Sequence, residues 1–485
     1  MIILGTNSVK DTGYDVANSC RFNAGDSDNM HKTPGSASNR RKFTFSCWIK
    51  KGDITPSADT CLFSGDNSDD NARPDDIRIK DTGKLQVAFR NTNDGVVSTK
   101  RVLRDPSAWM NIVVSIDTEQ STASNRVKIY INGVQETSLE GDGSGDPTYP
   151  SEDHDCTGFG RDTKITVGAR SMDTPDKFFD GYLAEVVYID GLQLAPTSFG
   201  EFDEDSPTIW KPIDVSELTF GTNGFYLDFE ASDNLGNDAN GGTDLTEVNL
   251  AATDSATDSP TNNFAIMNPL LIALGATVPA LSEGNLRVAN TIANKMQASY
   301  SNFAVSSGKW YVEIKMTAGT AFRPGISTLN IGQAEGEAGE NQNSPGLWTE
   351  GWGYFYDDGV LYNDNGDAGG TYAAFAAGDI VSIGLDMDNS KLFFGVNGTW
   401  QNSADPAAGT NSIDISGIAA GSDVAFGAAV ENSSAGATYS DVNFGSPVYA
   451  NSSSAADGNG YGDFEYAPPS GFLALCTKNL GSTGG

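Results

Sequence analysis

The chain has 485 residues, of which 64 are acidic and 30 are basic, and its formal net charge is −34. A protein that binds nucleic acid needs a basic surface to displace the counterions of the phosphates, and anionic membranes attract the same kind of surface. The sequence has no such basic cluster, so we expect neither nucleic acid nor a membrane surface as a partner. Its 55 glycines favour short strands joined by turns over helices.

Cysteine usage and the shortage of apolar segments indicate synthesis in a reducing compartment and no membrane insertion. The 5 cysteines are scattered, without a CxxC pair, and do not form a disulfide framework. The opening MIILGTNSVK lacks a long apolar region and a cleavage site, so we expect no Sec-type export signal. The longest apolar run, residues 269–281, contains two prolines and is too short to span a bilayer.

Strand signals begin early in the first half of the chain. Segments that alternate apolar with small or polar residues lie at 43–51, 84–91, 109–117, 126–135, 164–170, 182–191 and 223–230. Asn132-Gly133 stands between two apolar runs, which is the strongest short-range signal of a β-hairpin. The spacing of these strands and their turn residues predict an all-β sandwich.

Between residues 231 and 260 the composition becomes polar and rich in Gly, Asp, Ser and Thr, with little periodicity. This composition is typical of loops and linkers. We therefore predict that residues 231–260 are a polar connection between one domain, residues 1–230, and a second domain, residues 261–485.

The second half repeats the β pattern. Alternating segments lie at residues 308–316, 351–363 and 378–400, with turns at Asp357-Asp358-Gly359 and Asn397-Gly398. The apolar stretch from Gly471 to Leu480 predicts a further strand, which we expect to pack back on the second sandwich. No stretch has the pattern of a long amphipathic helix.

Aromatic residues, carboxylates and glycines are concentrated in GLWTEGWGYFYDDGVLYNDNG, residues 346–366. Aromatic faces beside polar groups are typical of sugar-binding sites, and aromatic residues also fill sandwich cores. In a strand, Trp352, Tyr354 and Tyr356 share one face and Phe355 points to the other. A face made only of aromatic residues is more often packed in the core, so we expect Trp352 and Tyr354 there, with ligand contact as the alternative.

Residues near the ends of this stretch are better placed for recognition. Trp348 and Tyr362 lie outside the centre of the hairpin and are expected at the surface, where aromatic rings stack on sugars. The candidate ligand-binding residues are Trp348, Tyr362, Asn363, Asp364 and Trp400.

Three segments of the first half resemble a laminin-G-like module of the concanavalin A type. These are FTFSCWIKK with LFSGDN, then WMNIVVSID with RVKIYINGVQ, and last FFDGYLAEVVYIDGLQLAPTSFGEF. The resemblance covers about residues 40–202, and the segments follow in the order that the family has. It implies a jelly-roll sandwich.

The second half resembles a SPRY domain over about residues 309–445. GKWYVEIKM is similar to the opening strand of that family, GWGYFYDDGVLYN to its hairpin, and GDIVSIGLDMDNSKLFFGVNG to its core strands. The two resemblances together imply an all-β chain of two concanavalin-A-like jelly-roll β-sandwiches in tandem.

The first resemblance raises the question of calcium and of catalysis. Concanavalin-A-type modules often hold Ca²⁺ in an acidic rim loop, for which Asp66, Asn67, Asp69 and Asp70 are the first candidates. A second acidic loop, residues 141–155, is a further candidate, and a solvated loop without metal is the alternative for both. Neither loop has the EF-hand pattern.

Some sandwiches of this type are glucanases with an E-x-D-x-x-E strand. The nearest string starts at Glu201 and has Ser206 where the last carboxylate should be. The two histidines fall in no metal-binding spacing, and there is no GxSxG elbow. We therefore expect no enzymatic activity.

Segments outside the two modules resemble the framing segments of virion proteins of tailed phages. They are GTNGFYLDFEASDNLGND, TDSPTNNFAIMNPL and FEYAPPSGFLALCTKNL. The resemblance implies a virion protein at the particle surface, assembled in the cytoplasm of a bacterial host. Other virion proteins are then expected as partners, with a homo-oligomer as the expected state.

Three functions remain open. A tail fibre, head fibre or other appendage that binds a glycan or protein of the host surface is the leading hypothesis. A capsid decoration or cementing protein is the second. A glycan depolymerase, with Glu201 and Asp203 as its first candidate catalytic residues, is the third.

Overall fold

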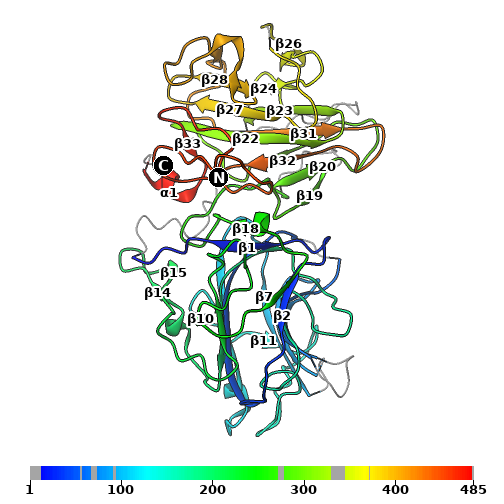
Figure 1. Cartoon of the computed structure of the whole chain (residues 1–485), viewed down its shortest axis with the longest axis vertical. Coiled ribbons are helices and arrows are strands. Elements are labelled where there is room, and N and C mark those ends of the chain that lie inside the picture. The colour runs from blue at the N-terminus through cyan, green and yellow to red at the C-terminus, as the bar shows by residue number, and fades with distance from the viewer. Residues whose placement is uncertain are drawn as a thin grey trace. The chain divides into compact units, whose positions relative to one another are not determined.

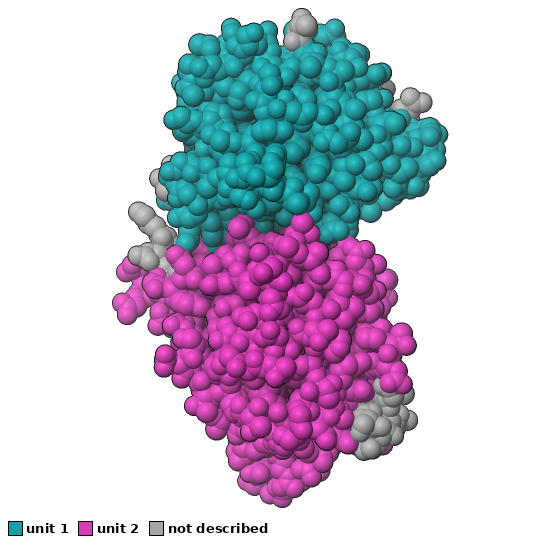
Figure 2. All heavy atoms as spheres, in the orientation of Figure 1, with its two compact units in different colours: residues 1–4, 262–485 teal, residues 5–261 magenta. Residues whose placement is uncertain are grey.

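The computed structural model describes residues 13–54, 57–66, 74–90, 94–270, 278–328, 344–370 and 372–482. Within these residues the chain forms two units, one that runs to Thr261 and one that starts at Asn262 (Figure 2). Each unit consists mainly of two β-sheets, as Figure 1 traces along the chain. The predicted fold class, all-β with two jelly-roll sandwiches, is confirmed.

The first unit pairs two sheets, whose described strands follow in spatial order. Sheet 1 consists of β10 (Val134–Gln135), β9 (Val127–Ile131), β8 (Met110–Asp117), β3 (Lys42–Lys51), β13 (Gly181–Asp190), β1 (Ser19–Phe22) and β18 (Ser255–Ala256), with β16 (Phe225–Leu227) also on β13. Sheet 2 consists of β11 (Leu139–Glu140), β7 (Gly95–Val102), β6 (Lys84–Phe89), β5 (Asp75–Ile79), β4 (Thr60–Gly65), β12 (Ile165–Val167), β2 (Asn29–Lys32) and β17 (Thr246–Val248). A separate hairpin joins β14 (Gly200–Phe202) to β15 (Trp210–Pro212).

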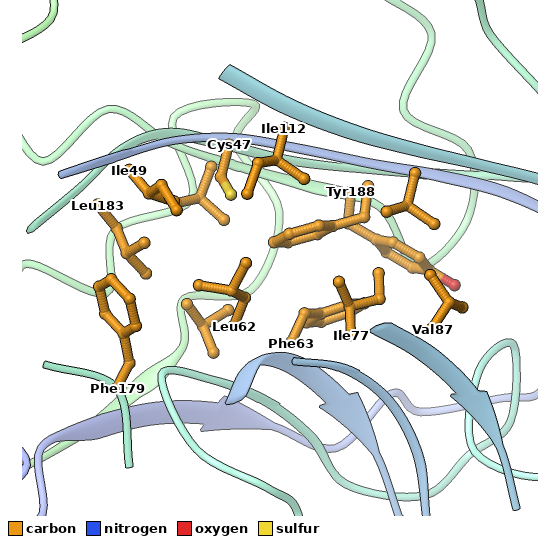
Figure 3. Packing of buried hydrophobic residues seen from close by; sticks show 14 of the residues in the cluster. Cys47, Ile49, Leu62, Phe63, Ile77, Val87, Ile112, Phe179, Leu183 and Tyr188 are labelled. Carbon is orange, nitrogen blue, oxygen red and sulfur yellow. The ribbon is translucent and has the colours of Figure 1, made fainter. Parts of the chain in front are cut away.

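The core of the first unit lies between sheets 1 and 2. Cys47 and Ile49 alternate with outward-facing residues along β3 and point toward Phe63 and Ile77 of sheet 2 (Figure 3). Tyr188 of β13 lies in the same layer, with its ring centroid 5.1 Å from that of Phe63. The two-residue periodicity of the sequence therefore produces this core, and each large side chain buried in it contributes about 1.5–3 kcal/mol.

The prediction that residues 231–260 connect two domains is wrong. Within this segment β17 pairs with β2 and β18 pairs with β1, so both strands belong to the sheets of the first unit. Two of its carboxylates are buried and paired: Asp238 accepts a hydrogen bond from the backbone N–H of Tyr226, and Asp258 binds Lys50. The composition resembles that of a linker because it counts these carboxylates as polar. It does not reveal that each of them pairs with a buried residue elsewhere in the sequence.

A buried carboxyl lies at an irregularity of β13. The register of β13 on β3 shifts between Ala184 and Val187, and Glu185 has a φ of 49° at this bulge. The Glu185 carboxyl accepts hydrogen bonds from the hydroxyl groups of Tyr226 at 2.9 Å and Tyr14 at 3.2 Å. Burial raises the pKa of Glu185 to about 8, although both tyrosine bonds act to lower it.

We expect the first unit to lose stability as the pH rises from about 4.5 to about 8. In this window the unfolded Glu185 carboxyl has lost its proton and the folded one retains it. The stabilisation is therefore complete below the lower pKa and declines by up to about 1.4 kcal/mol per pH unit. Urea unfolding across this range, on the wild type and on Glu185→Gln, measures the effect. Equal pH slopes for the two proteins would refute the assignment.

The second unit also pairs two sheets of described strands. Sheet 3 consists of β19 (Ala280–Ser282), β20 (Arg287–Ala289), β32 (Tyr439–Asn443), β22 (Lys309–Ala318), β27 (Ile380–Asp386), β28 (Lys391–Val396) and β29 (Thr399–Trp400), with β30 (Ile413–Asp414) on β28 and β33 (Leu473–Ala474) on β22. Sheet 4 consists of β21 (Gln297–Tyr300), β31 (Val424–Glu431), β23 (Ala321–Thr328), β24 (Gly351–Tyr354), β25 (Leu361–Asn363) and β26 (Gly366–Asp367). The short 3-10 turns in the described part of the chain are η1 (Ala123–Asn125), η2 (Pro196–Ser198), η3 (Ala252–Asp254) and η5 (Gln401–Ser403).

Both predicted Asn-Gly turns are confirmed. Asn132-Gly133 joins β9 to β10, and Asn397-Gly398 joins β28 to β29. All four residues have positive φ, between 48° and 77°, which is the conformation that such two-residue hairpin loops require.

The end of the described chain returns to the second unit, but not as one long strand. Only β33 pairs with β22, in parallel, and the helix α1 (Thr477–Ser482) follows it. The buried carboxylate of Asp457 causes this change of direction, since it accepts hydrogen bonds from the backbone of Ala474 and the side chain of Asn479. The predicted packing is confirmed, whereas the predicted strand from Gly471 to Leu480 is too long.

No helix among the described residues has the length and apolar character needed to cross a membrane.

Candidate ligand-binding face

The candidate site is on the side of sheet 4 that faces away from the core. Along β23, Phe322 and Ile326 point into the core, so Arg323 and Gly325 point outward. The strands β31, β23, β24 and β25 lie side by side in this sheet (Figure 1).

Three glycines form a flat row across this outward side. Gly325 is the register partner of both Gly353 on β24 and Gly427 on β31. Pro345 lies directly on the row: an added Cβ would stand 2.6 Å from Pro345 Cβ at Gly325 and 2.1 Å from Pro345 O at Gly353. The missing side chains therefore allow the segment 344–350 to lie on the backbone of the sheet.

We expect Gly353→Ala to displace the segment 344–350 and to destabilise the second unit by about 1–3 kcal/mol, the usual cost of overpacking. Gly366→Ala is the matched control, because its Cβ would meet its nearest neighbour at an ordinary 3.6 Å. The control should change stability by less than about 0.5 kcal/mol. Thermal and denaturant unfolding would measure both, and equal values for the two variants would contradict this packing.

Arg323 lies beside the glycine row, two residues before Gly325 on β23. Its side chain is buried, with 3% of the residue exposed, and Nη1 donates a hydrogen bond to Ser344 Oγ at 2.9 Å. The guanidinium group lies 4.4 Å from the ring centroid of Tyr362 and 5.1 Å from that of Phe355. These distances are those of cation–π contacts. Burial lowers the pKa of Arg323, because desolvation disfavours the charged form.

The structure brings four of the five predicted ligand-binding residues to this side of the sheet. Trp348 packs beside the cluster of Tyr300, Ala304 and Ala425, and its backbone O accepts a bond from the Asp364 N–H. Tyr362 contacts Arg323. The Asn363 amide group donates to the backbone O atoms of Thr349 and Gly351, and the Asp364 carboxylate accepts a bond from the Thr349 hydroxyl.

Exposure within this group is uneven. Trp348, Tyr362 and Asn363 are half-buried, and Asp364 is exposed. Trp348 and Tyr362 are thus less accessible than the sequence led us to expect, because the segment 344–350 lies against the sheet. Each still presents part of its surface to solvent.

Trp400 is not part of this face. It lies on β29 in sheet 3, where its ring centroid is 6.3 Å from that of Tyr311 and 6.5 Å from that of Phe393. It packs over Gly395, whose added Cβ would be 3.3 Å from the indole ring. Trp400 therefore covers the outside of the opposite sheet.

The aromatic centre of the hairpin fills the core, as predicted. Tyr354 is fully buried, and Trp352 and Tyr356 pack against the same cluster. Phe355 points to the other side, where it contacts Arg323. The alternation of the sequence correctly separates the scaffold residues from those of the outward side.

Sequence reasoning missed Arg323, Ser344 and the glycine row. The alternation in AFRPGIST does place Arg323 opposite the apolar residues of β23, which was an available signal. The glycine row could not be found in this way, because Gly325, Gly353 and Gly427 become neighbours only through the register of three strands.

The predicted calcium loops gain no support. Of the first set, Asn67, Asp69 and Asp70 lie outside the described residues. Asp66 directly follows β4, and its backbone forms hydrogen bonds with Lys164 and Thr163. In the second loop, Asp153 and Asp155 both bind Arg41, at 3.0 and 2.8 Å. Among the described residues, no three His, Cys, Asp or Glu side chains are grouped as metal ligands.

Glu201 and Asp203, the candidate catalytic pair, lie on or next to the β14–β15 hairpin. Lys211 is 3.4 Å from the Glu201 carboxylate and 3.6 Å from that of Asp203. Asp203 also accepts hydrogen bonds from the backbone N–H groups of Asp205 and Ser206. These contacts give both carboxylates a role in holding the hairpin.

Comparison with known proteins agrees with this architecture. Residues 25–191 match the concanavalin A-like lectin/glucanases superfamily, and residues 309–405 match the SPRY domain. No curated protein matches the chain.

Several solved structures are similar to parts of the chain. The SPRY domain of human HERC1 shares 17% identity over 31% of this chain and 83% of that one, with a TM-score of 0.23. The heptameric SAP-like pentraxin from Limulus polyphemus shares 15% over 38% and 80%, with a TM-score of 0.27. The TRIM65 PSpry domain shares 11% over 37% and 89%, with a TM-score of 0.28. The two family matches show that the chain carries a concanavalin A-like domain and a SPRY domain in tandem.

Proposed function

We propose that this protein is a structural component of a phage virion, in a fibre or other appendage, and binds a glycan or protein on the surface of the bacterial host. The observation that carries the binding role is the outward side of sheet 4, where Trp348 and Tyr362 are both half-buried and Tyr362 contacts Arg323. Aromatic faces next to polar side chains are what sugar sites use.

The virion role is supported by the segment at the end of the chain, which resembles the last segment of phage virion proteins. Here this segment is part of the SPRY unit. The buried carboxylate of Glu313 accepts hydrogen bonds from the backbone N–H groups of Glu465 and Tyr466, and β33 continues the sheet beside β22. Because this segment completes the fold of the SPRY unit, segment and unit form one structure. The resemblance of the segment to phage virion proteins therefore supports a virion role for the whole chain.

The proposed activity is binding without chemical change of the ligand. Domains of both types mostly bind rather than catalyse. The engagement of Glu201 and Asp203 by Lys211 supports this reading, since a glycosidase needs one carboxyl free to donate a proton. Release of reducing ends from host polysaccharide would contradict it.

Two measurements test the proposal. Mass spectrometry of purified particles should detect the chain, and the isolated protein should bind host cells or their polysaccharide. Copy number separates the appendage from the alternative, a decoration protein of the capsid, which would be present in far more copies per particle. A chain that is absent from particles and binds no host surface would refute the proposed function.

A further inference from the structure

Arg323 differs from the other buried arginines of the described chain. Arg21, Arg78 and Arg126 are each buried and each lie within 3.5 Å of a carboxylate oxygen. Arg323 is equally buried, yet none of the described carboxylates stands within the 4.0 Å of an ion pair. In a chain with 64 acidic residues, this lack of a partner is an exception.

The contacts of Arg323 leave most of its hydrogen-bonding capacity unused. A guanidinium group has five N–H donors, of which one, on Nη1, binds the neutral hydroxyl of Ser344. Nε is buried and has no acceptor in the described part of the chain. The two aromatic rings stabilise the charge through cation–π contacts but offer no hydrogen-bond acceptor, and burying an ion without a counter-charge is costly. Among the described residues, the guanidinium group therefore lacks an anionic partner.

A second donor on the same outward side is also unused. The indole Nε1 of Trp348 is buried without an acceptor among the described residues. Trp348 packs against the cluster that contains Ala425, and Arg323 pairs with Ala429, which lies on the other side of Gly427 on β31. The two donors therefore flank the glycine row, one on each side of it along the strand direction.

We propose that Arg323 binds a carboxylate of the ligand, so that the glycan recognised by this face is acidic and contains uronic or similar sugar acids. This inference rests on the proposed binding function and names its ligand class. The planar guanidinium fork matches a carboxylate through two parallel hydrogen bonds. A sugar fits better than a peptide, because the half-buried faces of Tyr362 and Phe355 flank the charge and stack on rings.

The overall charge of the chain does not prevent this contact. A net charge of −34 repels an acidic polymer at long range, but salt screens this repulsion beyond about 8 Å at physiological ionic strength. The contact at Arg323 is partly desolvated and is screened much less. Affinity for the acidic glycan should therefore hold or rise as salt increases, the reverse of binding by a basic surface patch.

The test uses the full chain and surface polysaccharide of the host, measured by isothermal titration calorimetry. The native polysaccharide is compared with two treated forms of the same material. Carboxyl reduction turns each carboxylate into an alcohol, and desulfation removes sulfate esters, the other common anionic group. We expect carboxyl reduction to weaken binding at least tenfold, because the reduced sugar loses the charge-assisted hydrogen bonds to the guanidinium group. Desulfation should leave the affinity unchanged.

Variants assign this effect to Arg323. Arg323→Met should lose tenfold or more in affinity for the native polysaccharide and should no longer distinguish it from the reduced form. Arg323→Lys keeps the charge but not the planar fork, so its affinity and its discrimination should lie between those of the wild type and Arg323→Met. Lys295→Met, with the same change of charge elsewhere in the second unit, should bind as the wild type does. Circular dichroism and melting temperature show whether each variant is folded.

Two results would overturn the proposal. In the first, the wild type binds reduced and native polysaccharide equally, a comparison that needs no variant. In the second, a folded Arg323→Met still discriminates between the two polysaccharides. In both cases glycan binding, and with it the proposed function, would stand.

Discussion

Replacement of Asp258 by Ala is expected to destabilise the first unit by about 3–5 kcal/mol, the usual effect of breaking a buried ion pair from one side. Asp258 Oδ2 lies 2.7 Å from Lys50 Nζ, and Oδ1 accepts a hydrogen bond from Trp109 Nε1 at 2.9 Å. Both charged side chains are almost fully buried. The variant would leave an ammonium group and an indole N–H without this acceptor, and burial already lowers the pKa of Lys50.

Two controls make this result specific. Asp233→Ala changes an exposed carboxylate of the same polar stretch and should alter stability by less than about 0.5 kcal/mol. Adding Lys50→Met to Asp258→Ala should recover much of the loss, since the unpaired charge is then gone. Chemical denaturation of the wild type and of these three variants measures the loss and its recovery. A loss below about 1 kcal/mol for Asp258→Ala would show that residues 231–260 do not support the first unit in this way.

Replacement of Trp348 by Ala is expected to reduce affinity for the host surface at least tenfold while the second unit remains folded. Aromatic anchors at the centre of an interface typically cost about 2 kcal/mol or more when they are removed. Trp348 is half-buried on the outward side of sheet 4 and is separate from the main core cluster of the unit. Binding to host cells, measured beside the melting temperature, would separate the two effects.

Tyr354→Ala is the contrasting variant. Tyr354 is fully buried, with its ring centroid 4.8 Å from that of Phe375 and 5.3 Å from that of Phe394. Its removal should cost about 3–5 kcal/mol, as for other large core residues, and should abolish binding only through loss of folding. If Trp348→Ala unfolds the protein and Tyr354→Ala selectively abolishes binding, the two faces of the hairpin have been assigned the wrong way round.

Much of the fold follows from local patterns. Alternation along β3, β8, β22 and β27 and the two Asn-Gly turns specify strands and hairpins without long-range information, because the side-chain period of a strand is two. The same rule correctly places Tyr354 inside and Phe355 outside.

The remainder depends on partners that are distant in the sequence. Residues 231–260 had the composition of a linker because Asp238 and Asp258 are polar, and their buried partners, Tyr226 and Lys50, cannot be read from that composition. The prediction of a long final strand was wrong for the same reason. Asp457, a distant residue in the sequence, redirects the chain after Ala474. At the candidate site, Trp348 and Tyr362 were found by residue type, whereas the glycine row beside Arg323 required the register of sheet 4.

The most direct test of the account is to locate the ligand on the chain by hydrogen exchange, with and without host polysaccharide. If the outward side of sheet 4 is the binding face, protection should increase in residues 344–366 and in β23. The β14–β15 hairpin and β29, which carries Trp400, should exchange as in the free protein. Protection confined to the first unit, or to β29, would contradict the assignment of the binding face.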